Sequence, residues 1–437
     1  MNPDESMFRI VPTETLGPCR YDSPLGAMRQ RFYTDGEWVI RRTRSHEFEE
    51  LEGPPFECFE RSGAREKLYF RPQDTTVGIV TCGGLCPGIN DVIRAITFAA
   101  AEGYGVKQVL GFQYGYEGLV AKYYHRPIEL NPDNTDDIHE KGGSILKSSR
   151  GPQDTGEIVD TLQHYCVDIL FAIGGDGTMR GVRDIHDEIA RRGLRISVIG
   201  VPKTIDNDIS LVERTFGYET AVESAWSTIT SAHAEAKGYR NGIGLVKLMG
   251  RDSGWIAAST ALANSNVNFC LIPEVPFDLE PPNGFLEHLR RRLMRRAHAV
   301  IVVAEGAGQN LFEGEYERDK SGNKRLHDIG VLLQEQIERF FAEQNTEINL
   351  KYFDPSYLIR STPANANDSE YCLRLGHNAV HAAMAGKTNC IVGLHCGVLV
   401  NLPMPMIGER KRVDPNGWTW QSVLQATRQP ADMTHEE

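Results

Sequence analysis

Apolar runs alternate with amphipathic stretches along most of the chain, and this alternation begins at Thr76. The run 77–80 precedes the stretch 90–99, whose apolar residues recur at helical spacing. Further runs that predict strands, with helical patterns between them, are 108–111, 168–173, 196–201, 243–248, 270–272 and 299–304. Strands that alternate with helices are typical of parallel sheets covered on both faces. We therefore predict an α/β fold with mostly parallel sheets.

Residues 1–72 differ from this pattern. They are rich in charge, proline and aromatic side chains and show no sustained periodicity, so we expect an N-terminal extension that wraps or caps a core. A chain of 437 residues, 41% of them hydrophobic, can bury substantial cores. That length suggests two domains, or three.

The charge balance narrows the classes of partner. A formal net charge of -12 weighs against nucleic acid or an acidic membrane as the main partner. Nine cysteines without a CxxC pair fit reduced thiols in a cytosol-like compartment. The sequence shows no signal peptide and no apolar stretch long enough to span a bilayer. We expect a soluble cytoplasmic protein.

Two polar segments directly follow predicted buried strands. Gly174–Thr178 offers glycine backbone that can lie against a phosphate, and it contains Asp176, which could hold Mg²⁺. Pro202–Asp208 offers a hydroxyl and paired acids that could orient and deprotonate an alcohol. Ligands of open parallel sheets bind beyond the carboxyl ends of the strands, where both segments fall. The pattern favours phosphoryl transfer to a small hydroxylated molecule.

Other predicted strand ends carry groups that suit phosphates and sugar hydroxyls. Arg251 could bind a phosphate through two hydrogen bonds, and Glu305 could accept hydrogen bonds from hydroxyls. Segments of similar character are Thr81–Asn90 with its paired glycines, Lys141–Gly151 with Arg150, and Tyr357–Arg360. Each has a structural alternative, such as a tight turn, a helix cap or a surface ion pair. Only the set as a whole favours a phosphate-handling site.

Together these segments resemble the 6-phosphofructokinase family, in order from about Thr76 to Trp420–Pro430. The string 202–208 is similar to that of the longer-chain branch, which includes ATP-dependent and pyrophosphate-dependent enzymes. The resemblance implies two Rossmann-like domains facing across an active-site cleft. It also implies an allosteric enzyme of glycolysis that assembles as a homotetramer, or a homodimer, with shared sugar-phosphate sites. The boundaries it implies are 73–217 plus 359–409 for the phosphoryl-donor domain, 218–358 for the fructose 6-phosphate domain and 410–437 for a C-terminal tail.

Site residues follow from the same resemblance. Asp206 becomes the general base on the C1 hydroxyl of fructose 6-phosphate, with Arg251 and Lys203 assisting transfer, and Asp176 holds Mg²⁺. The residues implied as ATP contacts are Gly84, Arg150, Gly151, Gly175, Asp176, Gly177 and Thr178. Those implied around the sugar phosphate are Thr204, Ile205, Asp206, Asp208, Met249, Gly250, Arg251, Glu305, Tyr357 and Arg360. Lys351 falls where a neighbouring subunit would supply a basic residue.

Gly177 bears on the choice of phosphoryl donor. Pyrophosphate-dependent relatives usually carry aspartate at this position, where a carboxylate would repel the α-phosphate of ATP, so glycine favours ATP. Lys203 is usual in pyrophosphate users, although ATP users of the longer branch also carry it. Lys147 stands where short-chain ATP enzymes have a small residue, and it could contact donor phosphates or narrow the nucleotide pocket. The two lysines keep pyrophosphate open as the donor.

Two other function classes stay open. A nucleotide or lipid kinase could share the acidic glycine-rich loop 174–178, but the segments that begin at Pro202, Met249 and Tyr357 argue against it. A non-catalytic sugar-phosphate sensor would be expected to lose Asp176 or Asp206, and both are present.

Overall fold

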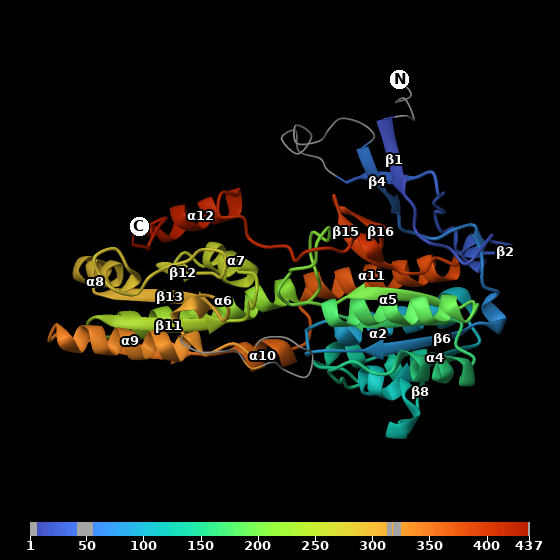
Figure 1. Ribbon diagram of the computed structural model, residues 1–437, viewed down its shortest axis with the longest axis horizontal. Coiled ribbons are helices and arrows are strands. Elements are labelled where there is room, and N and C mark those ends of the chain that lie inside the picture. The colour runs from blue at the N-terminus through green and yellow to red at the C-terminus, as the bar shows by residue number, and fades with distance from the viewer. Residues whose placement is uncertain (1–6, 42–55, 313–316, 318–324, 436–437) are drawn as a thin grey trace. The chain divides into compact units, whose positions relative to one another are not determined.

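The computed structural model describes residues 7–41, 56–312, 317 and 325–435. The remaining parts of the predicted extension (1–6 and 42–55) and of the predicted tail (436–437) lie outside the described residues. The chain divides into two compact units (Figure 1). The first comprises Met1–Thr204, Ile209–Gly217 and Thr362–Glu409, and the second comprises Ile205–Asp208, Tyr218–Ser361 and Arg410–Glu437.

The first unit is built on a mixed sheet with a parallel centre. Its strand order is β1-β4-β16-β15-β10-β9-β6-β7-β8, with β3 paired to β4. The parallel strands at the centre are β15 (Cys390–His395), β10 (Ser197–Pro202), β9 (Ile169–Gly174), β6 (Thr76–Thr81) and β7 (Gln108–Phe112). The strands towards the two edges are β8 (Ile128–Leu130), β16 (Val398–Pro403), β4 (Phe56–Arg61), β1 (Phe8–Val11) and β3 (Trp38–Ile40). Since β6, β9 and β10 are parallel neighbours, their carboxyl ends meet at one edge of the sheet.

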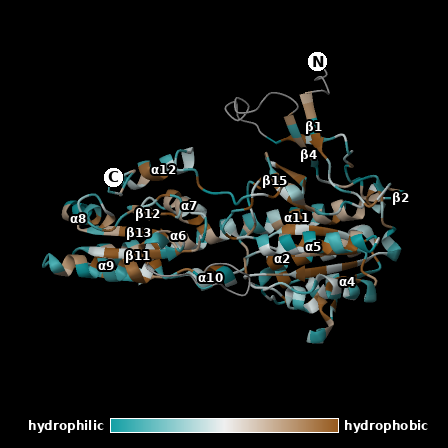
Figure 2. Cartoon of the chain, viewed as in Figure 1, coloured by the Kyte–Doolittle hydropathy of each residue, from teal (hydrophilic) through white to brown (hydrophobic). Residues whose placement is uncertain are grey.

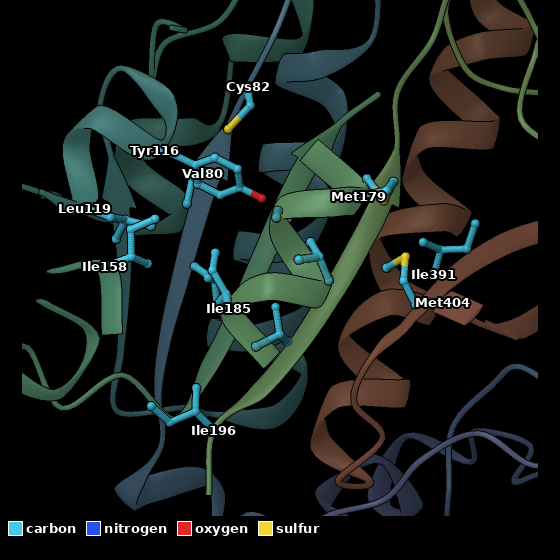
Figure 3. Packing of buried hydrophobic residues seen from close by; sticks show 14 of the residues in the cluster. Val80, Cys82, Tyr116, Leu119, Ile158, Met179, Ile185, Ile196, Ile391 and Met404 are labelled. Carbon is cyan, nitrogen blue, oxygen red and sulfur yellow. The ribbon is translucent and has the colours of Figure 1, made fainter. Parts of the chain in front are cut away.

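Helices cover this sheet with apolar side chains. One buried cluster joins strand residues such as Val80 to Ile158 of α4 (Thr155–His164) and Ile185 of α5 (Asp176–Arg191), and Figure 3 shows these side chains packed together. Two further helices, α2 (Ile89–Phe98) and α11 (Ala366–Met384), pack against each other, and α11 also packs against β10. The short helix α3 (Pro132–Thr135) and the strand pair β2 (Tyr21–Asp22) and β5 (Lys67–Leu68) complete the unit.

The second unit holds a parallel sheet in the order β12-β13-β11-β14. The strands are β12 (Phe269–Leu271), β13 (His298–Ala304), β11 (Gly242–Leu248) and β14 (Asn349–Phe353). Its helices are α6 (Tyr218–Gly238), α7 (Trp255–Ala263), α8 (Phe285–Arg296), α9 (Ile329–Glu343), α10 (Ser356–Ser361) and α12 (Trp418–Thr427).

Two hydrophobic cores cover the two faces of this second sheet. Val246 and Leu248 of β11 belong to a cluster with α6, α7 and α12, whereas Ile243 and Leu245 belong to a cluster with α8 and α9. Side chains of a strand point alternately to opposite faces, so each face has its own core. Figure 2 shows the strands largely brown, as expected for strands buried on both faces. It shows the helices banded in teal and brown, as expected for helices with one buried face.

Every strand predicted from an apolar run is confirmed, with limits that differ by at most one residue at either end. The α/β class with mostly parallel sheets is also confirmed. The described part of residues 1–72 packs with the first unit, in which β4 pairs with β16, and residues 410–435 pack with the second through α12 and α7.

A buried ionic network holds β4 within the first unit. Glu60 accepts hydrogen bonds from Arg65 Nη2 at 2.6 Å and from Lys387 Nζ at 2.9 Å, and all three residues are buried. Two cations that share one carboxylate in a poorly solvated place depend on its charge.

Glu60→Gln should therefore destabilise the protein strongly, because it leaves two buried cations with only the exposed carboxylate of Asp35 as their anion. Losing one partner of a buried ion pair costs about 3 kcal/mol. Urea unfolding followed by circular dichroism should show a lower midpoint for the transition. The control is Glu66→Gln, the same change at an exposed position six residues further on. Equal midpoints for the two variants would contradict a stabilising role for the network.

Candidate active site

The donor-type residues of the first unit gather at the carboxyl ends of β6, β9 and β10. Strand β9 ends at Gly174, Gly175 is the N-cap of α5, and Asp176 is the first residue of that helix. The N–H groups of a first helical turn point along the axis and attract anions. The segment therefore presents a phosphate-binding helix end with one carboxylate in its first turn.

Gly177 is not required by packing. A Cβ added there would meet only the guanidinium of Arg180, at an ordinary 3.8 Å. Gly84 and Gly175 are tighter, since their Cβ atoms would lie 3.3 Å from Arg150 Nη2 and from the carbonyl oxygen of Lys203. Thr178 is buried, and its carbonyl oxygen accepts a hydrogen bond from Tyr116. The open space beside Gly177 leaves room for a ligand next to the helix end.

The loop after β6 is tied to the segment that carries Arg150. The amide of Gly83 donates to the carbonyl of Ser149 at 3.1 Å, and the Ser148 hydroxyl donates to the carbonyl of Gly83 at 2.6 Å. Lys203, which follows β10, is buried and donates from Nζ to the carbonyl of Gly84 at 2.8 Å. Residues predicted to contact the phosphoryl donor, from three strand ends, are thus brought together in one unit. Gly151 lies in the same unit, and its φ of 104° suits glycine.

The side chain of Lys147 is directed to an aromatic stack. Its ammonium donates to the hydroxyl of Tyr114 at 2.8 Å and lies 4.5 Å from the centre of that ring, which stacks on His125. The backbone of Lys147 belongs to the donor loop, because its carbonyl accepts from the Thr81 hydroxyl at 2.6 Å. The described contacts therefore attach the side chain to Tyr114 and the main chain to the loop.

The residues present fit a magnesium ion bound through the donor phosphates. No cluster of three or more acidic, histidine or cysteine ligands occurs in the part of the chain that the structure describes. Mg²⁺ commonly uses one or two carboxylates, several waters and the phosphates of the substrate. A single carboxylate, Asp176, beside an anion-binding helix end meets that requirement.

Acidic and basic residues of the second unit surround Asp206. Burial, followed by the charges of Asp208 and Glu305, raises the pKa of Asp206 to about 7, while the backbone N–H of Arg251 and the charge of Arg360 favour its ionised form. The Ser253 hydroxyl donates to the carbonyl of Asp206 at 3.1 Å. A carboxyl with a pKa near neutrality is suited to accepting a proton at physiological pH.

Glycines allow the loops after β11 and β13 to approach closely. Gly250 has a φ of 131°, and a Cβ there would clash with the carbonyl of Ser253. A Cβ on Gly306 would overlap the carbonyl oxygen of Arg251, while the amide of Gly306 donates to the carbonyl of Gly250 at 3.0 Å. These contacts bring Glu305 beside Arg251. Gly306 directly follows Glu305, which the sequence places at a predicted strand end, but the sequence did not indicate this role of the glycine.

The remaining predicted sugar residues are only partly brought together. Arg360 Nε donates to the sulfur of Met249 at 3.3 Å, so these two adjoin. Tyr357 is 79% exposed, and its ring centre lies 5.7 Å from the Arg360 guanidinium. Ile205 packs against the α6–α7 core, whereas Thr204 belongs to the first unit and its carbonyl accepts from the Thr215 hydroxyl. Lys351, on β14, is exposed, with its ammonium 5.7 Å from the Tyr239 ring centre.

Sequence reasoning missed two basic residues beside the acids. Arg410 forms an ion pair with Asp252 and approaches Asp208, with Nε 3.8 Å from Oδ2. Lys411 donates from Nζ to the side-chain oxygen of Asn207 at 3.1 Å. The feature of the sequence that could have indicated these residues is the run of three basic residues 410–412. It follows a segment for which the sequence predicted neither a strand nor a helix.

Comparison with known proteins identifies relatives along most of the chain. An ATP-dependent 6-phosphofructokinase of Borreliella burgdorferi is 48% identical over 436 residues, covering 96% of this chain and 97% of the relative. An enzyme of the same name from Trypanosoma brucei brucei is 46% identical, covering 91% of this chain and 83% of the relative.

Within the described residues, no helix combines the length and apolar character needed to cross a membrane.

A solved structure shares the fold. The pyrophosphate-dependent phosphofructokinase of Marinobacter aquaeolei superposes with a TM-score of 0.66 at 20% identity, covering 83% of this chain and 92% of that one. The sequence model described as Phosphofructokinase matches residues 76–383, which include most of the site residues described above. The chain therefore belongs to the phosphofructokinase family.

Proposed function

We propose that this protein is an ATP-dependent 6-phosphofructokinase, which transfers the γ-phosphoryl group of ATP to the C1 hydroxyl of fructose 6-phosphate. The observation that carries the proposal is the acidic group of the second unit, in which Asp206 has a pKa of about 7 beside Arg251 and Arg360. Membership of the family and the names of relatives that are 42–48% identical support the same activity. The products are fructose 1,6-bisphosphate and ADP, as in glycolysis, and we place the enzyme in the cytoplasm.

Asp206 acts as the general base. Its carboxylate takes the proton of the C1 hydroxyl while the C1 oxygen forms a bond to the γ-phosphorus, and the bond from that phosphorus to the bridging oxygen of ADP breaks. Arg251 stabilises the negative charge that develops on the transferred group. Arg360 pairs with the 6-phosphate, and Glu305 and Asp208 accept hydrogen bonds from the sugar.

The first unit binds the donor. The helix end at Gly175–Thr178 and Arg150 hold the phosphates of ATP, and Lys203 stabilises the departing ADP. Asp176, together with the donor phosphates, would hold Mg²⁺, which would neutralise part of the phosphate charge when bound. Transfer requires donor and acceptor to be bound at the same time, one by each unit.

Pyrophosphate is the second candidate donor. The observation that favours it is the ammonium of Lys203 at the Gly84 carbonyl, where it could meet a small phosphate leaving group. The side chain of Lys147 gives no comparable support, because it is directed to Tyr114. A panel of ATP, GTP and pyrophosphate, each with Mg²⁺ and fructose 6-phosphate, distinguishes the donors. Tight sugar-phosphate binding without turnover with any donor would instead indicate a sensor.

We also propose a homotetramer, or a homodimer, in which Lys351 reaches the sugar phosphate of a neighbouring subunit. The exposure of Lys351 supports this assignment. Lys351→Ala should then raise the KM for fructose 6-phosphate while leaving the KM for ATP unchanged. Sedimentation velocity gives the assembly state, and a monomer with full activity would contradict the shared site.

Replacing Asp206 should abolish most of the chemistry with little effect on binding. Loss of a positioned base typically removes about 10²–10⁴ in rate, so Asp206→Ser should lower kcat at least about a hundredfold. Steady-state kinetics and calorimetric binding of fructose 6-phosphate provide the measurements. Asp432→Ser, at an exposed aspartate of the same unit, is the matched control and should keep the full rate. A fully active Asp206→Ser variant would remove this residue from the base role.

The pH dependence of kcat/KM should carry the signature of this base. Because the base acts only when ionised, activity should rise with pH through about 7 in the wild type. Asp208→Asn removes a like charge that raises the pKa of Asp206, so the rising limb should move to lower pH even if the maximal rate falls. Rates must be corrected for ionisation of the substrate phosphate. An unchanged limb in the Asp208→Asn variant would contradict the assignment.

Gly177→Asp should selectively weaken the use of ATP. The space beside Gly177 accepts a side chain without a clash, so the variant should fold. A like charge at about 4 Å with an effective dielectric of about 20 costs about 4 kcal/mol, roughly a thousandfold in binding. Gly177→Asn has nearly the same size without the charge and should lose much less. Faster turnover of the wild type with pyrophosphate than with ATP would overturn the donor assignment.

A further inference from the structure

Residues 410–413, here called the basic strap, run beside the turn 205–208 of the second unit, which contains the proposed base Asp206. The strap consists of Arg410, Lys411, Arg412 and Val413 and leads to α12. The amide of Lys411 donates to the carbonyl of Asp208 at 2.8 Å. A backbone hydrogen bond therefore fixes the strap directly to the turn that contains Asp206.

Side chains of the strap add contacts on both sides of that turn. The guanidinium of Arg410 pairs with Asp252 and places Nε 3.8 Å from Oδ2 of Asp208. Asp208 is two residues from the proposed base, and Asp252 directly follows Arg251. A planar guanidinium can serve two carboxylates at once, which a lysine ammonium on a flexible stem does less well.

Lys411 holds the residue between the two acids of the turn. Its ammonium donates to the side chain of Asn207 at 3.1 Å and lies 5.4 Å from the ring centre of Trp255. Asn207 has a φ of 53°, in the left-handed region that non-glycine residues seldom adopt. Asparagine adopts this region more readily than most residues, and the contact from the strap helps to hold Asn207 in it, and with it the direction of the neighbouring carboxylates.

The strap shares an anchor with the loop that carries Arg251. One carboxylate oxygen of Glu274 accepts hydrogen bonds from the amides of Val413 at 2.8 Å and Gly254 at 2.9 Å. The proposed base Asp206 lies on the 205–208 turn, and Arg251 lies on the loop after β11. Both segments are thus bound to the basic strap.

We propose that Arg410 is a positioning residue for phosphoryl transfer, because its ion pairs with Asp208 and Asp252 fix the proposed base and Arg251 relative to each other. The inference rests on the proposed function. Arg410 itself transfers no proton and needs no contact with the substrate. It acts by restricting the two segments that carry the reacting groups, and a misplacement of about 1 Å in such groups can cost about a hundredfold in rate.

The test compares Arg410→Ala, Arg410→Lys and the matched control Arg412→Ala in the full-length enzyme, with ATP and fructose 6-phosphate. Arg412 is the exposed arginine of the same strap. Arg410→Ala should lower kcat by about tenfold to a hundredfold, with the KM for ATP unchanged. Arg410→Lys should recover only part of the loss, and Arg412→Ala should keep the wild-type kcat. Added guanidinium chloride at low millimolar concentration should partly restore the rate of Arg410→Ala, whereas sodium chloride of equal ionic strength should not.

The outcomes separate the two claims. If the wild type turns over and the Arg410→Ala variant keeps the full kcat, the positioning role is overturned and the proposed function stands. A lower melting temperature with unchanged kcat would also overturn it, because it would show a purely structural role. If Arg410→Ala does not fold, a kcat of Arg410→Lys equal to that of the wild type would overturn the proposal. A wild type without turnover would overturn the proposed function and this inference with it.

Discussion

A carboxyl group that accepts a proton near neutral pH must be prevented from ionising at its ordinary pKa of about 4. In this protein, burial and two neighbouring carboxylates act on Asp206 in that direction, while a backbone N–H and Arg360 limit the effect. The balance requires three chain segments to lie close together, namely the turn after β10 and the loops after β11 and β13. The rest of the second unit can be understood as the framework that holds these segments.

The parallel sheets provide that framework in both units. Strands β6, β9 and β10 end side by side in the first unit, and β11 and β13 do so in the second. Buried apolar strands set the direction in which each loop leaves, and glycines such as Gly250 and Gly306 permit the approach of one loop to the next. The groups proposed to react are therefore placed by packing far from the proposed site, while the loops supply the chemical variety.

The sequence predicted the parts of this arrangement that depend on residues close together along the chain. The apolar runs of β6, β9, β10 and β13 stand out because both faces of those strands are buried. Strand β14 was missed because its residues Asn349–Phe353 are only partly buried or exposed and include a lysine. The segments after the strands could be recognised as candidate binding loops, because their glycines and acids follow strands directly.

What could not be predicted depends on contacts between distant positions. Arg410 lies some 200 residues from Asp208 along the chain, and only the return of the chain after β16 brings them together. The direction of the Lys147 side chain likewise depends on Tyr114, which adopts left-handed backbone angles that its sequence does not reveal. The role of β4 within the extension could not be predicted for the same reason, since it depends on the pairing of Glu60 with the distant Lys387.

The most direct test of this account is a titration of the Asp206 carboxyl itself. Infrared difference spectra between the wild type and Asp206→Asn, recorded across the pH range, report the protonated carboxyl of this one residue. We expect its band to disappear with a midpoint near 7. A midpoint near the ordinary aspartate value of about 4 would contradict the view that its surroundings prepare it to act as the base.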